Sequence, residues 1–294
     1  MMQYICVQPD NVYFRWQVET LINNLLAIGV QPDDINIVML YKDKPSIESK
    51  KIQLRTLVNF YFYKDERYNK SYQPSIKPYG LFKYFQQNNT SKIYFYCDSD
   101  IIIQNKIDNV NLTGKNVYLS NCIDYIGYNY CISKGYRQFE AMCDVVGIDK
   151  QLVEKNQNNS GGAQYIINIT DYMFWYKVYC DSVNLYITLQ QTKSQDGNDI
   201  QIWCCEMWST LWNMWKRGYQ THIVDWLDFS FATSHIDEQR NIIHNSGVTE
   251  KDKQYNLFLK QDFYNKYPQL SDLQHINEQY CSSIYTKWVQ RIVI

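Results

Sequence analysis

Two aspartates spaced by one residue, Asp98 and Asp100, follow the clearest strand-like run of the sequence, KIYFYC at residues 92–97. Ligands of α/β proteins collect at the carboxyl ends of parallel strands, so both carboxylates should face such a site. Two neighbouring carboxylates repel each other unless a cation lies between them. Hard divalent cations such as Mn²⁺ and Mg²⁺ take oxygen ligands and also hold diphosphates. The pair therefore predicts a divalent cation site, against the alternative of an ordinary acidic surface triplet.

A histidine late in the chain, His244, is the second candidate ligand. It opens the run HNSG, which follows the apolar pair at residues 242–243. A neutral imidazole binds a cation that carboxylates already hold. Gly247 would let the backbone approach a phosphate closely, and Lys251 could neutralise that phosphate. The alternative is a surface turn that carries a solvated histidine.

A turn rich in glycine and small polar residues, NNSGG at residues 158–162, is the third candidate. Paired glycines let the backbone approach a ligand, and asparagine and serine offer short polar contacts. The candidate residues are Asn159, Ser160, Gly161 and Gly162. The alternative is an ordinary turn ahead of an apolar segment, without a ligand.

An acidic residue inside a strongly aromatic run, Glu206 in WCCEMWSTLWNMW, is the fourth candidate. The large apolar residues that follow it share one helical face and are interpreted as core packing. They are Trp208, Leu211, Trp212 and Trp215. A carboxylate among such neighbours is partly desolvated, so it either has a polar partner or takes part in chemistry.

The elements that must position these groups alternate between strands and helices. A strand over 3–8, a helix over 12–28 that ends at Gly29, and a strand over 35–40 form a βαβ unit. Residues 42–78 are interpreted as helix plus irregular connection. Further elements are expected as helices over 79–85, 136–146 and 199–217, as strands over 117–120 and 222–225, and as a strand or helix start over 163–169. The alternation favours an α/β fold with a parallel sheet.

The composition bounds the class of function. The 294 residues include 29 Lys+Arg and 30 Asp+Glu, and the net charge of −1 argues against a basic nucleic-acid coat but leaves a local basic patch open. With 45% hydrophobic residues, the chain can bury a large core and is neither disordered nor fibrous. No apolar run approaches the roughly 20 residues of a membrane span. We expect no signal peptide, no anchor and no membrane partner.

The cysteines and the amino-acid bias bear on location. The nine cysteines are scattered and form no CxxC pair, which argues against zinc and fits reduced thiols in a cytoplasm. The bias toward Lys, Asn, Ile and Tyr suggests an AT-rich genome, such as that of a virus or phage. The expected location is then the host cytoplasm. The oligomeric state stays open.

Taken in order, these four motifs resemble a GT-A-fold glycosyltransferase over roughly residues 2–251. That family has an N-terminal nucleotide-binding βαβ region, a DxD at a strand end, a central Asn-Ser-Gly turn, an acidic residue on a later helix and a late HxxG. The Glu-Met-Trp step at 206–208 and the Lys77-Pro78 step are similar to the retaining hydroxyproline arabinosyltransferase and serine galactosyltransferase branch. This sequence lacks the Lys-Pro-Trp that often follows HxxG, and we expect it to have no signal anchor of the kind found in that branch.

The resemblance implies a Rossmann-like βαβ sandwich with a central mixed sheet in one domain, residues 1–250. Residues 251–294 would form a helical extension packed on that domain. It also implies that a UDP-sugar binds at the sheet edge and that Asp98, Asp100 and His244 hold Mn²⁺ or Mg²⁺ on its diphosphate. Glu206 would lie near the anomeric carbon, and transfer would proceed with retention. The implied donor and acceptor contacts are Gln8, Lys77, Ser99, Asn159, Ser160, Gly161, Gly162, Gly247 and Lys251.

The acceptor is open between two classes. Some phages glycosylate hydroxymethylated pyrimidines in their DNA, so double-stranded DNA is one acceptor, reached through a local basic groove and base flipping. The residues considered for its phosphates are Lys50, Lys51, Arg55, Lys216 and Arg217, each of which could equally lie on a solvated helix face. A protein or glycan acceptor is the alternative.

Two other classes of protein compete with this interpretation. A haloacid-dehalogenase-type phosphatase also carries DxD after an apolar strand, with the first aspartate as nucleophile. That motif normally lies very early in the chain, whereas here it begins at residue 98. A non-catalytic sugar-nucleotide binder would use exposed aromatic side chains to stack on sugar rings.

Overall fold

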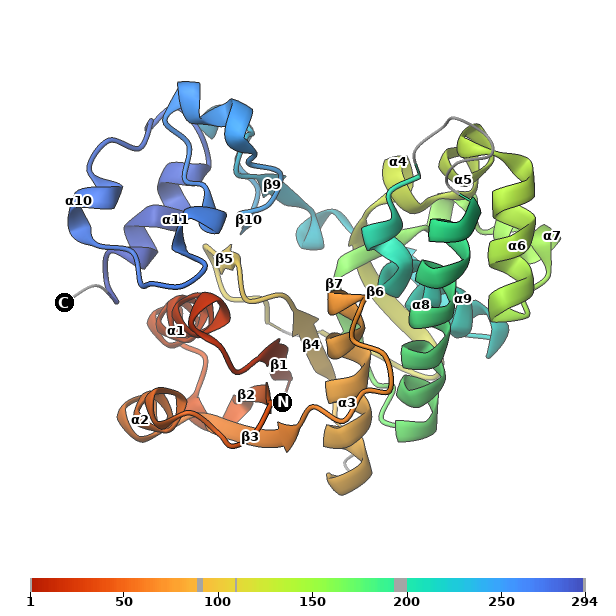
Figure 1. Cartoon of the computed structure of the whole chain (residues 1–294), viewed down its shortest axis with the longest axis horizontal. Coiled ribbons are helices and arrows are strands. Elements are labelled where there is room, and N and C mark those ends of the chain that lie inside the picture. Colours follow the sequence, from red (N-terminus) through yellow and green to blue (C-terminus); the bar gives the residue numbers. More distant parts are fainter. Residues whose placement is uncertain (1, 89–91, 109, 193–199, 293–294) are drawn as a thin grey trace. The chain divides into compact units, whose positions relative to one another are not determined.

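The computed structural model describes residues 2–88, 92–108, 110–192 and 200–292. The chain forms two compact units. The first comprises Met1–Lys64, Cys97–Val110 and Trp226–Ile294, and the second comprises Asp65–Tyr96 and Asn111–Asp225. Figure 1 labels most of their helices and strands and colours the chain from the N-terminus (red) to the C-terminus (blue). The division into residues 1–250 and 251–294 stays a prediction.

The first unit opens with the predicted βαβ arrangement. Strand β1 (Gln3–Pro9) pairs in parallel with β2 (Ile35–Tyr41), and helix α1 (Val12–Ala27) connects them. The side chain of Asn11 caps α1 by accepting a hydrogen bond from the Phe14 amide at 3.1 Å. Gly29, at a φ of 87°, follows the end of the helix.

A third parallel strand lies in the stretch for which the sequence predicted only helix and irregular connection. Helix α2 (Ile47–Thr56) is followed by β3 (Asn59–Lys64), which pairs with β2 and completes the order β3-β2-β1. Its sequence, NFYFYK, has four aromatic residues in a row, so both faces of the strand carry aromatic side chains and apolar residues do not alternate with polar ones. The strand was therefore hidden from a search for period-two alternation.

A small second sheet of the first unit combines three short strands from distant parts of the sequence. Strands β5 (Ile101–Ile103), β10 (Ile242–His244) and β9 (Phe229–Phe231) lie in the order β5-β10-β9. β10 is antiparallel to β5 and parallel to β9. The side chain of Asn24 on α1 holds β5 through two hydrogen bonds with the Ile103 backbone, at 2.8 and 2.9 Å.

The residues after β10 pack on α1 and β5. They form the 3-10 helices η7 (Glu250–Tyr255) and η8 (Lys260–Phe263) and the helices α10 (Leu270–Leu273) and α11 (Ser282–Val289). The buried cluster that joins these segments consists of Trp16, Ile102, Ile243, Phe258, Phe263, Leu273, Cys281, Tyr285, Val289 and Ile292. Removal of this apolar surface from water holds the C-terminal segment in place within the unit.

In the second unit, four strands lie in the order β4-β7-β6-β8. They are β4 (Tyr94–Cys97), β6 (Asn116–Asn121), β7 (Gly161–Ile167) and β8 (Gln220–Ile223). β7 is antiparallel to both β4 and β6, whereas β6 and β8 are parallel. The segment 163–169, left open between strand and helix, is thus largely strand.

One long helix of the second unit contacts several of its other helices. Helix α8 (Tyr172–Thr192) packs against both α3 (Ile76–Gln87) and α9 (Cys205–Lys216). The helix expected over 199–217 begins at Cys205, behind the 3-10 turn η4 (Ile202–Cys204), and residue 199 lies outside the described residues. The other helices of this unit are η2 (Gln73–Ser75), α4 (Ile123–Ile126), α5 (Tyr128–Lys134), α6 (Tyr136–Val146), α7 (Lys150–Lys155) and η3 (Gln157–Asn159).

The predicted fold class is confirmed. Strands and helices alternate along the chain. β1, β2 and β3 pair in parallel, whereas β7 is antiparallel to both β4 and β6, so the strand directions are mixed. The aromatic face of α9 is core, because Trp208, Leu211, Trp212 and Trp215 are all buried. Within the described ranges, no helix combines the length and apolar character needed to cross a membrane.

Candidate metal and donor site

Asp98, Asp100 and His244 come together in the first unit. Each offers a ligand atom, a carboxylate oxygen or a ring nitrogen, and these atoms lie within 4.8 Å of one another. His244 Nε2 lies 3.3 Å from Asp100 Oδ1. Asp100 and His244 are buried, each 8% exposed. The structure thus brings together the three residues that the sequence proposed as metal ligands.

The pairing of two three-residue strands brings the histidine to the aspartates. In the antiparallel register of β5 and β10, His244 stands opposite Ile101, the residue directly after Asp100. The next amide, that of Asn245, donates to the Asp100 carbonyl at 2.8 Å. Ile102 and Ile243, opposite each other in the same register, are buried in the core. Burial of these isoleucines therefore fixes the spacing of the cluster.

A lysine that the sequence analysis did not single out completes the surroundings of Asp100. Lys260, the first residue of η8, forms an ion pair with Asp100 Oδ2. Burial alone would raise the pKa of Asp100, but the Lys260 ammonium and then His244 outweigh it and hold this pKa well below its ordinary value. Nothing local in the sequence marks Lys260, because 160 residues separate it from its partner.

The donor set of this cluster fits a divalent cation. Two carboxylates and one imidazole offer the oxygen and nitrogen ligands that Mn²⁺ accepts, and carboxylates suit Mg²⁺ as well. Among the described residues, three buried polar atoms beside the cluster have no hydrogen-bond partner: His244 Nδ1 and both side-chain polar atoms of Asn245. Buried polar atoms of this kind call for a partner, such as an ordered water or a ligand.

The other first-unit candidates occupy different environments. Ser99 is fully buried, and its hydroxyl donates to Gln17 Oε1 at 3.4 Å. Gln8 is buried within β1. Gly247 has a φ of 85°, a region that favours glycine, whereas Lys251 is exposed on η7. Their proposed contacts with the donor stay predictions.

In the second unit, Glu206 and Lys77 form an ion pair. Glu206 Oε2 lies 3.1 Å from Lys77 Nζ, and the exposed fractions of the two side chains are 3% and 17%. Lys77 comes from α3 and Glu206 from the first turn of α9. The Glu206 amide also donates to the Tyr72 hydroxyl at 2.9 Å. The sequence predicted a polar partner or chemistry for this desolvated carboxylate, and the polar partner is present.

The Asn-Ser-Gly turn lies at the entry to β7 and contacts the start of α9. A Cβ on Gly162 would lie 2.6 Å from Cε of Met207, the residue after Glu206. A Cβ on Gly161 would lie 2.5 Å from Leu119 Cβ in β6. Ser160 is buried, and its hydroxyl donates to the Asn156 carbonyl at 3.3 Å. Close packing of the backbone therefore explains both glycines.

The side chain that opens this turn is locally held. Asn159 is the last residue of η3, and its side-chain nitrogen Nδ2 donates to Asn156 Oδ1 at 3.2 Å. The Asn159 carbonyl accepts a hydrogen bond from the Thr221 hydroxyl at 3.0 Å. These contacts hold Asn159 beside β8 and leave its predicted contact with a donor or acceptor untested.

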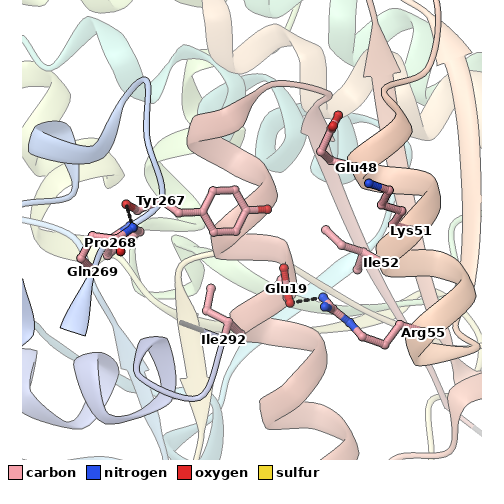
Figure 2. A pocket seen from close by; sticks show the side chains of 9 residues that line it. All are labelled: Glu19, Glu48, Lys51, Ile52, Arg55, Tyr267, Pro268, Gln269 and Ile292. Carbon is pink, nitrogen blue, oxygen red and sulfur yellow. Dashed lines mark hydrogen bonds and ion pairs between the residues drawn. The ribbon is translucent and has the colours of Figure 1, made fainter. Parts of the chain in front are cut away.

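A separate pocket of the first unit, of about 300 Å³, is lined by Glu19, Glu48, Lys51, Ile52, Arg55, Tyr267, Pro268, Gln269 and Ile292. Figure 2 shows Arg55 reaching from α2 to Glu19 on α1, where the two form an ion pair. Burial raises the pKa of Glu19 against the opposing effect of Arg55. No residue of the Asp98–Asp100–His244 cluster lines this pocket. Arg55, considered above for a DNA phosphate, thus already pairs with a carboxylate.

A pocket of the second unit, of about 440 Å³, has Lys216 and Arg217 among its lining residues. Arg217 Nη1 lies 2.5 Å from Asp171 Oδ2, and Lys216 Nζ donates to the Val146 carbonyl at 2.9 Å. Lys216 and Arg217, two of the five cations considered for DNA contact, therefore have partners within the protein.

No protein-family model and no curated protein sequence matches this chain. Solved structures do. The bifunctional glycosyltransferase WbbM in its apo form is 10% identical, with a TM-score of 0.53, over 99% of this chain and 52% of WbbM. The galactosyltransferase LgtC, in complex with donor and acceptor sugar analogues, is 12% identical, with a TM-score of 0.52, over 98% of this chain and 95% of LgtC. An active-site mutant of LgtC gives 14% identity and a TM-score of 0.50 over 85% and 88%.

These likenesses concern the fold. The chain spans about half the length of WbbM and nearly all of LgtC. At such identities a shared activity does not follow from similarity alone. The predicted GT-A glycosyltransferase fold is confirmed.

Proposed function

We propose that this protein is a metal-dependent glycosyltransferase that moves a sugar from a UDP-sugar to a hydroxyl acceptor. The observation that carries the proposal is the cluster of Asp98, Asp100 and His244, whose ligand atoms lie within 4.8 Å of one another. The fold supports it, since the galactosyltransferase LgtC, solved with donor and acceptor analogues, has a similar structure. The proposal joins a site suited to a cation with a fold used for sugar transfer.

Asp98, Asp100 and His244 would hold the cation, for which we propose Mn²⁺ ahead of Mg²⁺ because imidazole is a ligand more typical of transition metals. When bound, the cation would neutralise negative charge on the diphosphate leaving group. Gly247 would allow the backbone to approach the diphosphate, with Lys251 beside it. Gln8 and Ser99 would contact the nucleoside and the donor from the same unit.

Glu206 is proposed as the catalytic residue. A carboxylate that is 3% exposed and already balanced by the Lys77 ammonium can stabilise positive charge on an anomeric carbon or orient the acceptor hydroxyl. We propose retention of configuration, on the resemblance of the Glu-Met-Trp and Lys-Pro steps to a retaining branch. The turn Asn159–Gly162 would line the sugar or the acceptor, because Gly162 packs against the residue next to Glu206.

For the acceptor we propose 5-hydroxymethylpyrimidine in double-stranded phage DNA, with a protein or glycan hydroxyl as the alternative. The amino-acid bias of the chain supports the DNA acceptor. The protein partners of Arg55, Lys216 and Arg217 reduce the support from charged surface. The nine cysteines all lie within the described residues and form no disulfide there, in keeping with the cytoplasmic location that we propose.

The test is a panel of UDP- and GDP-sugars with Mn²⁺, read by thermal shift and by nucleotide release. We expect a UDP-sugar to stabilise the protein only when Mn²⁺ is present and to be hydrolysed slowly. D98N and D100N should lose the metal-dependent shift. E206Q should keep the shift and lose turnover by about 10²-fold or more. D262N is the matched control, since Asp262 pairs with Lys253 at an exposed position of the same unit.

The alternatives give different results in this test. A phosphatase would form a phospho-enzyme that D98N abolishes. A non-catalytic binder would turn over no UDP-sugar, and E206Q would leave its ligand binding intact. The absence of a metal-dependent shift with every nucleotide would refute the proposed site. Hydroxymethylated DNA, unmodified DNA and glycan acceptors, offered in parallel with the identified donor, then separate the acceptor classes.

A further inference from the structure

Both carboxylate oxygens of Asp100 have a nitrogen partner within the protein. His244 Nε2 lies 3.3 Å from Oδ1, and Lys260 Nζ pairs with Oδ2. The side chains of Asp100 and Lys260 are 12% and 16% exposed. An ammonium thus occupies one of the oxygens that a divalent cation would need.

The backbone that carries this lysine is firmly held. Lys260 begins η8, and Phe263 at the other end of η8 is 6% exposed and stacks on Phe258 with ring centroids 5.1 Å apart. Both phenylalanines belong to the cluster around Trp16. Lysine has a flexible four-carbon stem, so the ammonium of Lys260 could change partner while η8 stays folded.

Charge balance explains why a lysine should stand here. A carboxylate this buried is costly unless an opposite charge compensates it. An ammonium and a divalent cation on the same carboxylate would repel each other, so the two must compete for Asp100. A diphosphate that arrives with the cation would give the displaced ammonium a new anionic partner.

We propose that Lys260 is the resident counterion of the metal site. Its ammonium pairs with Asp100 until Mn²⁺ displaces the ammonium, which then faces the diphosphate. The inference rests on the proposed function, because it takes the cation and the diphosphate from it. It assigns Lys260 a positioning role that makes Mn²⁺ alone bind weakly and makes Mn²⁺ and UDP bind cooperatively. Metal loading would thus depend on the presence of the donor.

The experiment measures Mn²⁺ binding by calorimetry, with and without UDP, in the wild type, K260M and K260R. Without UDP, K260M should bind Mn²⁺ at least about tenfold more tightly than the wild type does, because the competing charge is gone. With UDP, K260M should lose most of the cooperativity, whereas K260R should keep both properties of the wild type. K253M is the matched control, because Lys253 forms exposed ion pairs with Glu250 and Asp262 in the same unit.

The outcomes separate this inference from the proposed function. Equal Mn²⁺ affinity in the wild type and K260M, or weaker binding in K260M, would overturn the role of Lys260 and leave the glycosyltransferase proposal standing. If no chain binds Mn²⁺ even with UDP, and no UDP-sugar is hydrolysed, both proposals fail. Thermal denaturation shows whether K260M is folded, and K260Q, which keeps a hydrogen-bond donor without the charge, serves where it is not.

Discussion

Removal of either partner of the ion pair between Lys77 and Glu206 should destabilise the second unit. At 3.1 Å between Nζ and Oε2, and with an effective dielectric constant of about 20, the Coulomb attraction is about 5 kcal/mol before desolvation is subtracted. Breaking a buried pair by removing one partner costs about 3–5 kcal/mol. This pair is nearly as enclosed, with side chains 17% and 3% exposed.

The two single variants should differ, because the partners differ in exposure. K77M takes a positive charge away from a carboxylate that is 3% exposed, and should lower the free energy of unfolding by about 3 kcal/mol or more. E206Q leaves a lysine that is 17% exposed and can turn toward water, so the loss should be about 1–2 kcal/mol. The double variant K77M/E206Q should lose less than the sum.

Urea denaturation at neutral pH of the wild type, the two single variants and the double variant gives the coupling energy, for which we expect about 2–3 kcal/mol. The exposed pair of Arg217 and Asp171, with side chains 39% and 50% exposed, is the control within the same unit. Its coupling should stay below about 1 kcal/mol. A Lys77–Glu206 coupling as small as that of the control would refute the reasoning from burial.

Three further predictions concern packing, pH and metal. G161A should lower the free energy of unfolding by about 2–4 kcal/mol, because its Cβ would lie 2.5 Å from a side-chain carbon and 2.7 Å from a backbone oxygen of β6. G162A should cost less, because the nearest atom is the end of the flexible Met207 side chain. Thermal denaturation of the two variants makes the comparison. Burial raises the pKa of Glu19 above its ordinary value of 4.5, so the folded state holds this proton more tightly than the unfolded state does. The free energy of unfolding of the wild type, relative to that of E19Q, should therefore fall as pH rises from about 4 to 7. A difference between the two that does not change with pH would contradict the burial argument. Mn²⁺ at about 100 times its dissociation constant should stabilise the wild type by about 2.7 kcal/mol, and D98N should show no such gain in the same denaturation assay.

The sequence predicted the ligands of the candidate site by type, but their approach depends on long-range pairing. Asp98 and Asp100 were evident because the strand-like run KIYFYC ends directly before them. The strands that bring His244 beside them, β5 and β10, have three residues each, too few for any periodicity to appear. Their pairing follows from burial of their isoleucines with Trp16 and Phe258, residues far away in the sequence.

The longer elements were predictable for the opposite reason. The helix Tyr136–Val146 was predicted with the bounds that the structure has, because its apolar face repeats over three turns and ends at Gly147, which has a φ of 69°. Strand β3 was missed because its aromatic residues do not alternate with polar ones. Lys260 had no local signal at all, since its role comes from a contact and not from a motif.

Two buried carboxylates, Asp100 of the first unit and Glu206 of the second, share one physical requirement and differ in how it can be met. Asp100 and Glu206 each have a lysine partner, Lys260 and Lys77, because an interior carboxylate needs a compensating charge before any ligand arrives. Asp100 also lies near Asp98 and His244, two further groups that could ligate a metal, so we expect a divalent cation to replace its lysine. No such cluster surrounds Glu206 among the described residues, and its lysine has no competitor of that kind. The same pairing of acid and lysine is therefore expected to be exchangeable at Asp100 and permanent at Glu206.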